Sequence, residues 1–497
     1  MTRAPGFALA LIVLLGLALR VYHVHNPILD HPAWRQGDEA AIARNFLELN
    51  NNILYPQADY DGPPPNYVEL ELQLVPYAAA QLYRIFGVHE IFARLIVIAL
   101  SVATIPLIYA LGSEIYSRRA GMIAALLFAI APGAVYYGRA IIPESGMLFF
   151  SVAALLFWWR WIERRRVADF SLAAGCAMLA CLAKPPALLI LGPMLALWFV
   201  RVRSFRDFSP YALVALCVVP LWLYLGHLSR IAEWHWATGI TQLHVVPTLI
   251  AELTSPSRLI AGLQSTLALS KMLTTTILGP VIFGLLLVCA FLQPADAQRK
   301  GRSVFFGTWI TLLIVYTFAV VNVERVDYYL MPFVPFAVLS VGGGLDYLLS
   351  LVAPQGLTAR TIGALAVAIF LTTYINMLEV HPYYTWSREV YAAAGEVRRV
   401  LEPNTLIVMG HYDPSVLYTI GHRGWEEDPM LWSVRDMTSA IAKGARYFVA
   451  VEVPRFKANK ELYALMQRYE RLPIHSGWQV YDLRRRASAG HQSYNNQ

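Results

Sequence analysis

Residues His31–Phe46 read H-P-A-W-R-Q-G-D-E-A-A-I-A-R-N-F, and we expect the rest of the chain to be organised around them. They follow the first apolar run of the chain and carry two adjacent carboxylates, Asp38 and Glu39. Apolar residues then recur at helical steps, so we expect an amphipathic helix with Asp38 near its N-terminus. A carboxylate at such a position usually caps the helix and does nothing else. A chemical role for Asp38 therefore depends on where the rest of the chain places it.

The composition predicts a polytopic α-helical membrane protein. Of the 497 residues 57% are hydrophobic and 15% are charged, and the mean hydropathy is +0.47. A soluble core of this length needs far fewer apolar residues. The net charge of +7 comes from short basic clusters between apolar runs, which is the positive-inside pattern and argues against a nucleic-acid partner. The four cysteines lie inside apolar runs with no metal-ligand spacing.

The apolar runs predict eleven membrane spans. Residues 66–86 are also mostly apolar, but a continuous polar stripe indicates a helix on the membrane surface. If this segment stays outside, every arginine-rich connection falls on one side, together with Arg3. We therefore predict a multi-pass protein of the cytoplasmic (inner) membrane with a first outer loop at 26–90. The predicted spans are 7–24, 91–113, 120–137, 145–160, 169–183, 185–200, 209–226, 272–292, 303–321, 329–350 and 361–378.

Two further outer turns carry charged residues. The turn Tyr136–Ser145 holds Arg139 and Glu144, and a tight turn holds Lys184. A charged pair beside a helix is ordinarily a solvated cap, and a lone lysine at a helix end usually extends to the interface. Together with Asp38, however, they give one membrane face two carboxylate-bearing loops and neighbouring cations. Few ionisable residues lie deep in the spans, so no ion path is evident.

After about residue 379 the composition changes. Residues 405–410, 446–452 and 478–483 read as short buried strands, and 388–401 and 459–471 as helices. We expect a transmembrane domain over 1–378, an extracytoplasmic α/β domain over 379–486, and a disordered polar tail over 487–497. The cluster His411-Tyr412-Asp413 follows the first strand, where such domains often bind ligands. A plain loop with a helix start at Asp413-Pro414 is the favoured interpretation.

Several motifs follow one another in a distinctive order. They are the Asp38-Glu39 pair, the G-P-P turn from Gly62, the L-Y-R-I-F-G segment at 82–87, Arg94-Leu95, the turn from Arg139 to Glu144, and Y-Y-L-M-P-F-V-P-F at 328–336. In this order and spacing the chain resembles the GT-C glycosyltransferases over roughly residues 7–350. Within that superfamily it most resembles the branch of protein O-mannosyltransferases and lipid A aminoarabinose transferases, which is glycosyltransferase family 39-like.

The resemblance implies a GT-C fold and the transfer of one sugar from a polyprenyl-phosphate donor. The acceptor would be an extracytoplasmic glycan, lipid or protein, and the anomeric carbon would invert. The catalytic carboxylate of the family maps onto Asp38, with Glu39 beside it, and the second acid maps onto Glu144. Aminoarabinose transferases carry a lysine before the proline of the first-loop turn, where this chain has Gly62. That departure puts aminoarabinose and lipid A in doubt as substrates.

The chemistry of the transfer agrees with these positions. A hydroxyl that attacks an anomeric carbon needs a base, and Asp38 is a candidate. The phosphate that leaves needs cations, and the candidates are Arg139, Lys184 and Arg35. Asp38 and Glu144 are able to hold Mg²⁺ or Mn²⁺, and equally able to work without a metal. No organic cofactor is expected.

Two other classes of protein share some of these features. A flippase or transporter of polyprenyl-linked glycans is disfavoured, because the sequence shows no pair of similar halves. A ligase or polymerase of whole oligosaccharides uses the same kind of lipid donor, so this alternative stays open.

Overall fold

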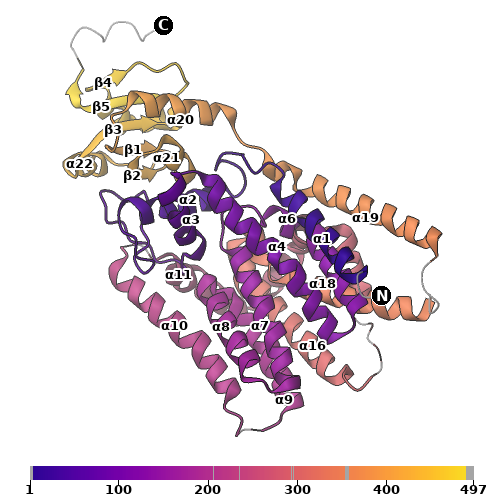
Figure 1. Cartoon of the computed structure of the whole chain (residues 1–497). Helices are drawn as coiled ribbons and strands as arrows, with labels where there is room; N and C mark the ends of the chain where they lie inside the picture. Colours follow the sequence, from indigo (N-terminus) through magenta and orange to yellow (C-terminus); the bar gives the residue numbers. More distant parts are fainter. Residues whose placement is uncertain are drawn as a thin grey trace.

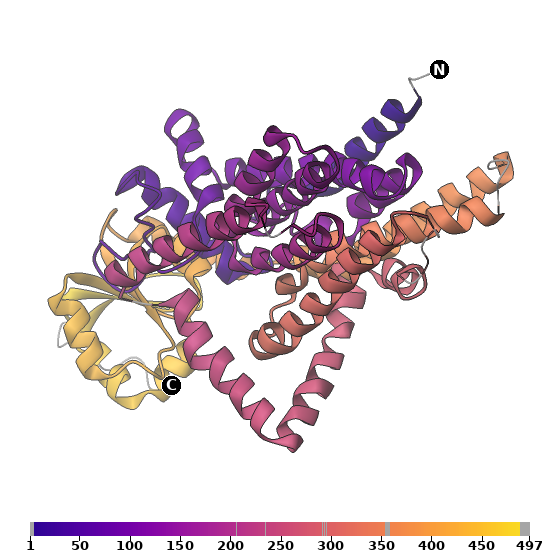
Figure 2. The ribbon, with the colours of Figure 1, turned by 90° about the horizontal axis from the view of Figure 1, so that it is seen from below.

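The computed structural model describes residues 4–487 except 205, 234, 291, 293, 295 and 353–357. The predicted disordered tail, apart from Ala487, lies outside the described residues. A bundle of helices forms most of the molecule, and a small α/β unit sits at one end of it (Figure 1). Two perpendicular views place the start of the first helix at the opposite end (Figure 2).

The first half of the bundle is built around four helices packed in the order α5, α4, α7, α8. Helix α7 packs against α4 and α8, and α5 packs against α4. The elements are α1 (Ala4–Val21), α2 (Ala33–Glu48), α3 (Leu74–Phe86), α4 (Glu90–Ile115), α5 (Arg118–Ile130), α6 (Pro132–Tyr136), α7 (Glu144–Arg164), α8 (Val167–Ala183), η1 (Pro185–Ile190), α9 (Leu191–Arg201) and α10 (Ser209–Ile231).

The second half completes the bundle with long helices and several short ones. The elements are α11 (Trp236–Gly239), η2 (Ile240–Val245), α12 (Val246–Thr254), α13 (Pro256–Ala268), α14 (Ser270–Met272), η3 (Leu273–Ile277), α15 (Pro280–Cys289), α16 (Arg299–Tyr316), η4 (Thr317–Val321), α17 (Asn322–Glu324), η5 (Asp327–Leu330), α18 (Phe333–Val352), α19 (Ala359–Val380) and η6 (His381–Tyr384).

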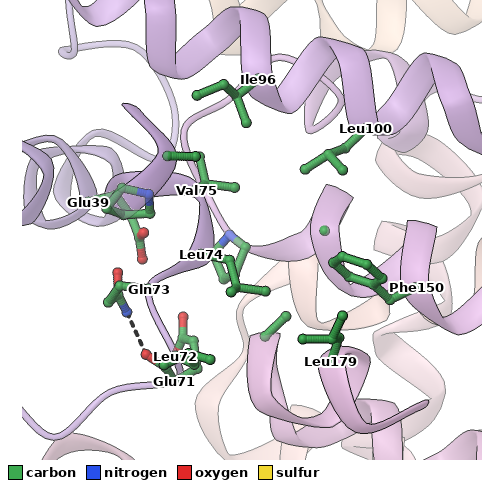
Figure 3. Close-up of a pocket in the computed structure, with 15 residues that line it drawn as sticks. Glu39, Glu71, Leu72, Gln73, Leu74, Val75, Ile96, Leu100, Phe150 and Leu179 are labelled. Carbon is green, nitrogen blue, oxygen red and sulfur yellow. Dashed lines mark hydrogen bonds between the residues drawn. The ribbon is translucent and has the colours of Figure 1, made fainter. Parts of the chain in front are cut away.

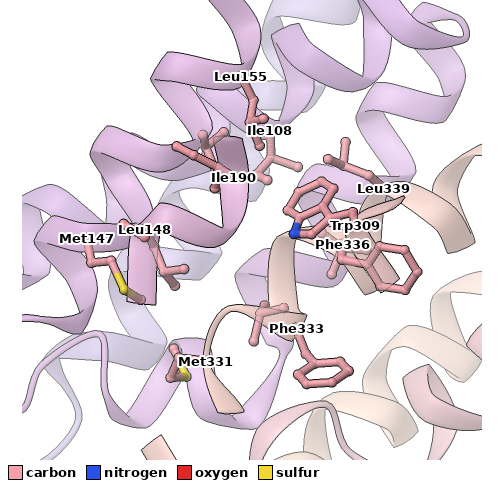
Figure 4. Close-up of a cluster of buried hydrophobic side chains, with 14 of the residues drawn as sticks. Ile108, Met147, Leu148, Leu155, Ile190, Trp309, Met331, Phe333, Phe336 and Leu339 are labelled. Atoms are coloured by element: carbon pink, nitrogen blue, oxygen red, sulfur yellow. The ribbon is translucent and has the colours of Figure 1, made fainter. Parts of the chain in front are cut away.

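The core of the bundle consists of interlocked aromatic and aliphatic side chains. Trp309 of α16 meets Phe336 of α18 edge to face, with ring centroids 5.8 Å apart (Figure 4). Small residues let α18 come close to its neighbours. A Cβ atom at Gly342 would lie 2.7 Å from the carbonyl oxygen of Ala120, and one at Gly344 would lie 2.5 Å from the Cβ of Cys289. The run of three glycines is thus a helix-packing surface.

The described chain contains six helices long and apolar enough to cross a membrane, or seven if one bent pair counts as a span. Three further apolar helices are shorter: 6–21, 167–183 and 185–201. The chain is therefore a multi-pass membrane protein. The count of eleven spans stays a prediction, because only these six or seven of the described helices are long and apolar enough by themselves. The predicted span at 272–292 is broken. The helical stretch 256–277 and α15 meet there at an angle of 119°.

Three local predictions are corrected by the structure. Helix α2 begins at Ala33, five residues before Asp38, and its N-cap residue is Pro32. Within 66–86 only α3 is helical, and its 13 residues are too few to span a bilayer. The predicted spans 209–226 and 272–292 leave residues 227–271 as an outer loop, but this segment is mostly helical, and α12 and α13 form a V that stands away from the bundle (Figure 2). Helices α12 and α13 expose apolar side chains, which a solvated loop would not be expected to do.

The C-terminal unit is an α/β sheet, as predicted. Its elements are α20 (Arg388–Val400), β1 (Leu406–Gly410), α21 (Pro414–Ile420), β2 (Arg423–Glu427), α22 (Val434–Ala442), β3 (Ala445–Ala450), α23 (Val453–Ala458), α24 (Lys460–Met466), β4 (Tyr469–Leu472) and β5 (Gln479–Arg486). The strand order is β2-β1-β3-β5-β4. Strand β1 is parallel to its neighbours β2 and β3, whereas β5 is antiparallel to its neighbours β3 and β4. The three predicted strands are confirmed, and β2 and β4 are additional.

The α/β unit is held tightly against the first outer loop. The backbone N–H of Gly62 donates to the carbonyl of Gly424 at 2.7 Å, and the N–H of Gly424 donates to the carbonyl of Asp59 at 2.8 Å. Helix α21 also packs directly on α2. A Cβ atom at Gly37 would lie 2.5 Å from the backbone nitrogen of Ser415, so only glycine allows this approach. The α/β unit therefore borders the segment that carries Asp38.

Candidate active site

Asp38 lies in the interior of α2, where it is almost fully buried. Its side chain is 6% exposed, and residues 36–43 are all buried between the bundle and the α/β unit. Its Oδ1 atom has no hydrogen-bond partner among the residues that the structure describes. Burial raises the pKa of Asp38 to about 7, although the Arg35 charge and a hydrogen bond from Tyr60 oppose the rise. Asp38 is therefore a carboxylate whose basicity is matched to neutral pH.

Arg35 lies one turn before Asp38 and Glu39 and joins two carboxylates. Its guanidinium is 2.8 Å from Oε1 of Glu39 and donates a hydrogen bond to Glu71. Burial raises the pKa of Glu39, and the negative charges of Glu71 and Asp38 add to the rise while Arg35 opposes it. Glu71 was not among the predicted site residues. The alternation V-E-L-E-L-Q at 68–73 does signal an extended segment there, and the structure has one.

Lys184 and Glu144 form a second buried ion pair. Glu144 is the first residue of α7 and Lys184 directly follows α8, so two helix ends place these side chains. The ammonium of Lys184 pairs with Oε1 of Glu144 and lies 4.8 Å and 4.7 Å from the ring centroids of Tyr328 and Tyr329. Oε2 of Glu144 has no hydrogen-bond partner in the described part of the chain.

An apolar cavity of about 260 Å³ lies between the two ion pairs. Its walls come from the start of α3 and from α4, α7 and α8, and include Ile96, Leu100, Phe150 and Leu179 (Figure 3). Glu39 and Glu71 line its polar end, while Pro143, Gly146 and Ala183 place it next to Glu144 and Lys184. The cavity is thus apolar along most of its length. The carboxylates that pair with Arg35 line one end of it, and the Glu144–Lys184 pair adjoins it.

Arg139 is not brought to this cavity. Its guanidinium is fully buried, pairs with Asp30 and donates to the carbonyl of His23 at 3.1 Å. Arg94 also reaches Asp30, at 3.2 Å. Burial raises the pKa of Asp30, and the Arg139 charge opposes that rise. Because both arginines are bound to a buried carboxylate, this cluster fixes the start of α2 rather than offering a free cation.

Comparison with known proteins supports the superfamily. Residues 73–224 match the family model for dolichyl-phosphate-mannose-protein mannosyltransferase. The structure of ArnT from Cupriavidus metallidurans bound to undecaprenyl phosphate superposes with a TM-score of 0.62 at 12% identity, covering 95% of this chain and 97% of that one. This chain therefore has the GT-C fold.

Other GT-C structures agree with that assignment. The archaeal oligosaccharyltransferase AglB from Archaeoglobus fulgidus, in complex with an inhibitory peptide and a dolichol-phosphate, superposes with a TM-score of 0.58 at 14% identity. The match covers 96% of this chain and 74% of AglB. No curated protein matches the sequence. At these identities the likeness establishes the GT-C fold alone.

The side chains around Asp38 and Glu144 bear on the possible metal site there. Across residues 4–487, outside the gaps given above, no three or more His, Cys, Asp or Glu side chains gather as metal ligands. One GT-C relative from Archaeoglobus fulgidus was solved as a complex with Zn and sulfate. In this chain Glu144 is instead neutralised by Lys184, while Asp38 interacts with Arg35 and Tyr60. The donor set therefore does not fit a cation shared by Asp38 and Glu144.

Proposed function

We propose that this chain is a membrane glycosyltransferase that moves a single sugar from a polyprenyl-phosphate donor to an extracytoplasmic acceptor, with inversion. The observation that carries the proposal is the grouping of a base, two cations and an apolar cavity. The base is Asp38, with a pKa of about 7. The cations are Arg35, whose partner Glu71 lines the cavity, and Lys184, whose partner Glu144 adjoins it. A lipid-phosphate sugar needs all three of these elements.

The proposed reaction is one displacement. The acceptor hydroxyl attacks the anomeric carbon, the bond from that carbon to the phosphate oxygen breaks, and Asp38 takes the hydroxyl proton. Arg35 and Lys184 stabilise the negative charge of the departing polyprenyl phosphate. Glu39, Glu71 and Glu144 would hold these two cations in place between turnovers. A single displacement inverts the anomeric configuration. Arg139 leaves the proposed phosphate-binding set because it is fully buried and shares Asp30 with Arg94.

The choice of a lipid-phosphate donor has two supports. The wall residues of the cavity are almost all apolar, which suits a polyprenyl chain. Two GT-C relatives were solved with undecaprenyl phosphate or dolichol-phosphate bound. The likeness to AglB keeps an oligosaccharide ligase as the second candidate. The two are separated by the size of the transferred unit, which is one sugar for the proposed enzyme and a whole glycan for a ligase.

A vesicle assay tests the proposal against the flippase alternative. Purified protein in liposomes would receive a panel of radiolabelled polyprenyl-phosphate monosaccharides together with a cell-envelope extract as acceptor source. We expect label to move from the lipid to a new species and free polyprenyl phosphate to accumulate. Label that crosses the bilayer still attached to its lipid would overturn the proposal.

Transfer should not need a divalent cation. Because Lys184 already neutralises Glu144, we expect transfer to survive exhaustive chelation with little change. Activity would be measured before and after chelation, with Mg²⁺, Mn²⁺ and Zn²⁺ added back separately. Loss on chelation that one of these ions restores would reinstate a metal at Asp38 and Glu144.

The pH dependence should follow Asp38. A general base must be deprotonated, so kcat/KM should rise tenfold per pH unit below about 7 and level off above it. Burial is the cause of the high pKa, so the bend should lie well above pH 4, where an exposed aspartate titrates. Initial rates between pH 5 and 9 would measure it. A flat profile across that range would exclude Asp38 as the titrating base.

The predicted topology places the active site and the α/β unit outside the membrane. Single cysteines at the exposed positions Ser229 and Lys443 should react with a membrane-impermeant thiol reagent on intact cells. Cysteines at the exposed positions Arg118 and Arg166 should react only after lysis. The background would lack the four native cysteines. Labelling of Arg118→Cys on intact cells would reverse the predicted orientation.

A further inference from the structure

Three aromatic side chains from distant segments meet beside Asp38. Trp34 opens α2, Trp236 opens α11, and Tyr412 lies between β1 and α21 of the α/β unit. The ring centroids of Trp34 and Trp236 are 5.8 Å apart, and those of Trp34 and Tyr412 are 5.4 Å apart. Trp34 is 41% exposed and Tyr412 is 46% exposed. Three large rings thus form one patch that reaches the surface.

Carboxylates border this aromatic patch. Burial raises the pKa of the Tyr412 hydroxyl to about 12, and the negative charges of Glu426, Glu427, Asp38 and Asp61 add to the rise. Glu426 is 9% exposed, and its Oε2 atom has no hydrogen-bond partner among the described residues, like Oδ1 of Asp38. The indole N–H of Trp236 is also buried without a partner there.

Two of these carboxyl groups, Asp38 and Asp61, titrate near neutral pH. Burial raises the pKa of Asp61 to about 7, with the charges of Glu233 and Glu427 adding to the rise. Burial also holds the pKa of Glu426 well above its ordinary value, with the charge of Asp38 adding to the effect. Such groups can both donate and accept hydrogen bonds. In their ionised forms they are unfavourable neighbours for an anion.

We propose that the patch of Trp34, Trp236 and Tyr412 binds the acceptor, and that the acceptor is an uncharged carbohydrate. The aliphatic C–H faces of a sugar ring pack on aromatic rings, while its hydroxyls satisfy the unpaired atoms of Glu426, Asp38 and Trp236. A phosphorylated acceptor would meet the negative charge of these carboxylates. This inference rests on the proposed function, since it takes Asp38 as the base for an acceptor hydroxyl.

The α/β unit gains a specific role from this assignment. It supplies Tyr412 and Glu426, and the contact of Gly37 with Ser415 fixes the distance between them and Asp38. The loop after β1 would then contact the acceptor directly. That role differs from the plain loop that the sequence favours.

Saturation-transfer NMR on the full-length protein in nanodiscs tests the proposal. The probes are neutral linear oligosaccharides, mannotetraose, maltotetraose and arabinotetraose, with mannose 6-phosphate as the anionic counterpart. We expect saturation transfer to at least one neutral probe, at least a fivefold loss in the double variant Trp34→Ala/Tyr412→Ala, and none to mannose 6-phosphate. Tyr391→Ala is the matched control. Its exposed ring pairs with Trp386 at 5.5 Å on a different element, and it should leave the signal unchanged.

Two results would overturn the carbohydrate assignment. One is the absence of transfer to every neutral probe, and the other is a signal that the double variant retains. Native mass spectrometry on the same samples would measure how much undecaprenyl phosphate the protein retains. This measurement separates the acceptor-site proposal from the proposed transferase function. Bound lipid without bound sugar would refute the acceptor assignment alone, while loss of lipid binding by the wild-type protein would count against the transferase itself.

Discussion

Replacing Asp38 with Asn should lower sugar transfer at least 10²-fold while the protein stays folded. The two side chains are nearly the same size, so the change removes basicity and charge from a site that is already buried. A positioned general base typically contributes a factor of about 10²–10⁴. Initial rates with a saturating lipid donor would measure the effect, and the melting temperature would report on folding.

Glu48→Gln is the matched control for this variant. Glu48 also lies on α2, and its replacement by Gln also removes one negative charge. Its side chain, however, is exposed and pairs with Arg423 of β2. We expect transfer by Glu48→Gln to stay within about twofold of the wild type. If the Asp38→Asn variant keeps a substantial fraction of wild-type activity, another group must accept the proton.

Replacing Lys184 with Gln should impair both donor binding and stability. The variant loses a cation that we assign to the phosphate, and it leaves Glu144 buried without a partner. Breaking one side of a buried ion pair costs about 3–5 kcal/mol. We therefore expect a large fall in melting temperature and at least a tenfold weaker retention of undecaprenyl phosphate.

A double variant separates these two effects. In Glu144→Gln/Lys184→Gln neither side chain is charged, so the melting temperature should recover most of its loss. Lipid-phosphate binding and transfer should stay low, because the cation is still missing. Lys271→Gln, which removes an exposed lysine of α14, should change neither quantity. Recovery of transfer in the double variant would mean that Lys184 serves only to neutralise Glu144.

Sequence patterns predict the membrane helices and the sheet better than they predict the site. Long apolar runs give α4, α7, α10 and α18 directly, and short buried runs give β1, β3 and β5. Asp38, Glu144 and Lys184 are found because charged residues beside apolar helices are conspicuous. The start of α2 is missed because Ala33 to Gln36 carry no capping residue, and its N-cap is Pro32.

The missing part of the site depends on tertiary contacts. Arg139 looks like a free cation in the sequence, but its partner Asp30 lies 109 residues away along the chain. Glu71 lies in an extended segment that the alternation at 68–73 signals, but its pairing with Arg35 is a tertiary contact. Strand β2, R-G-W-E-E, is short and partly polar, so neither it nor Glu426 stands out from the surrounding loop. Their place beside Asp38 follows only from the docking of the α/β unit on α2.

Transfer of one sugar from a lipid phosphate with inversion can be followed directly by NMR. Polyprenyl-phosphate monosaccharides labelled with carbon-13 at the anomeric carbon would be incubated with the purified protein and acceptor. We expect the anomeric signal to move from the phosphate-linked form to a glycoside of opposite configuration, with loss of its coupling to phosphorus. A product of unchanged configuration, or a signal that stays coupled to phosphorus while the wild-type protein is active on the lipid, would contradict this expectation.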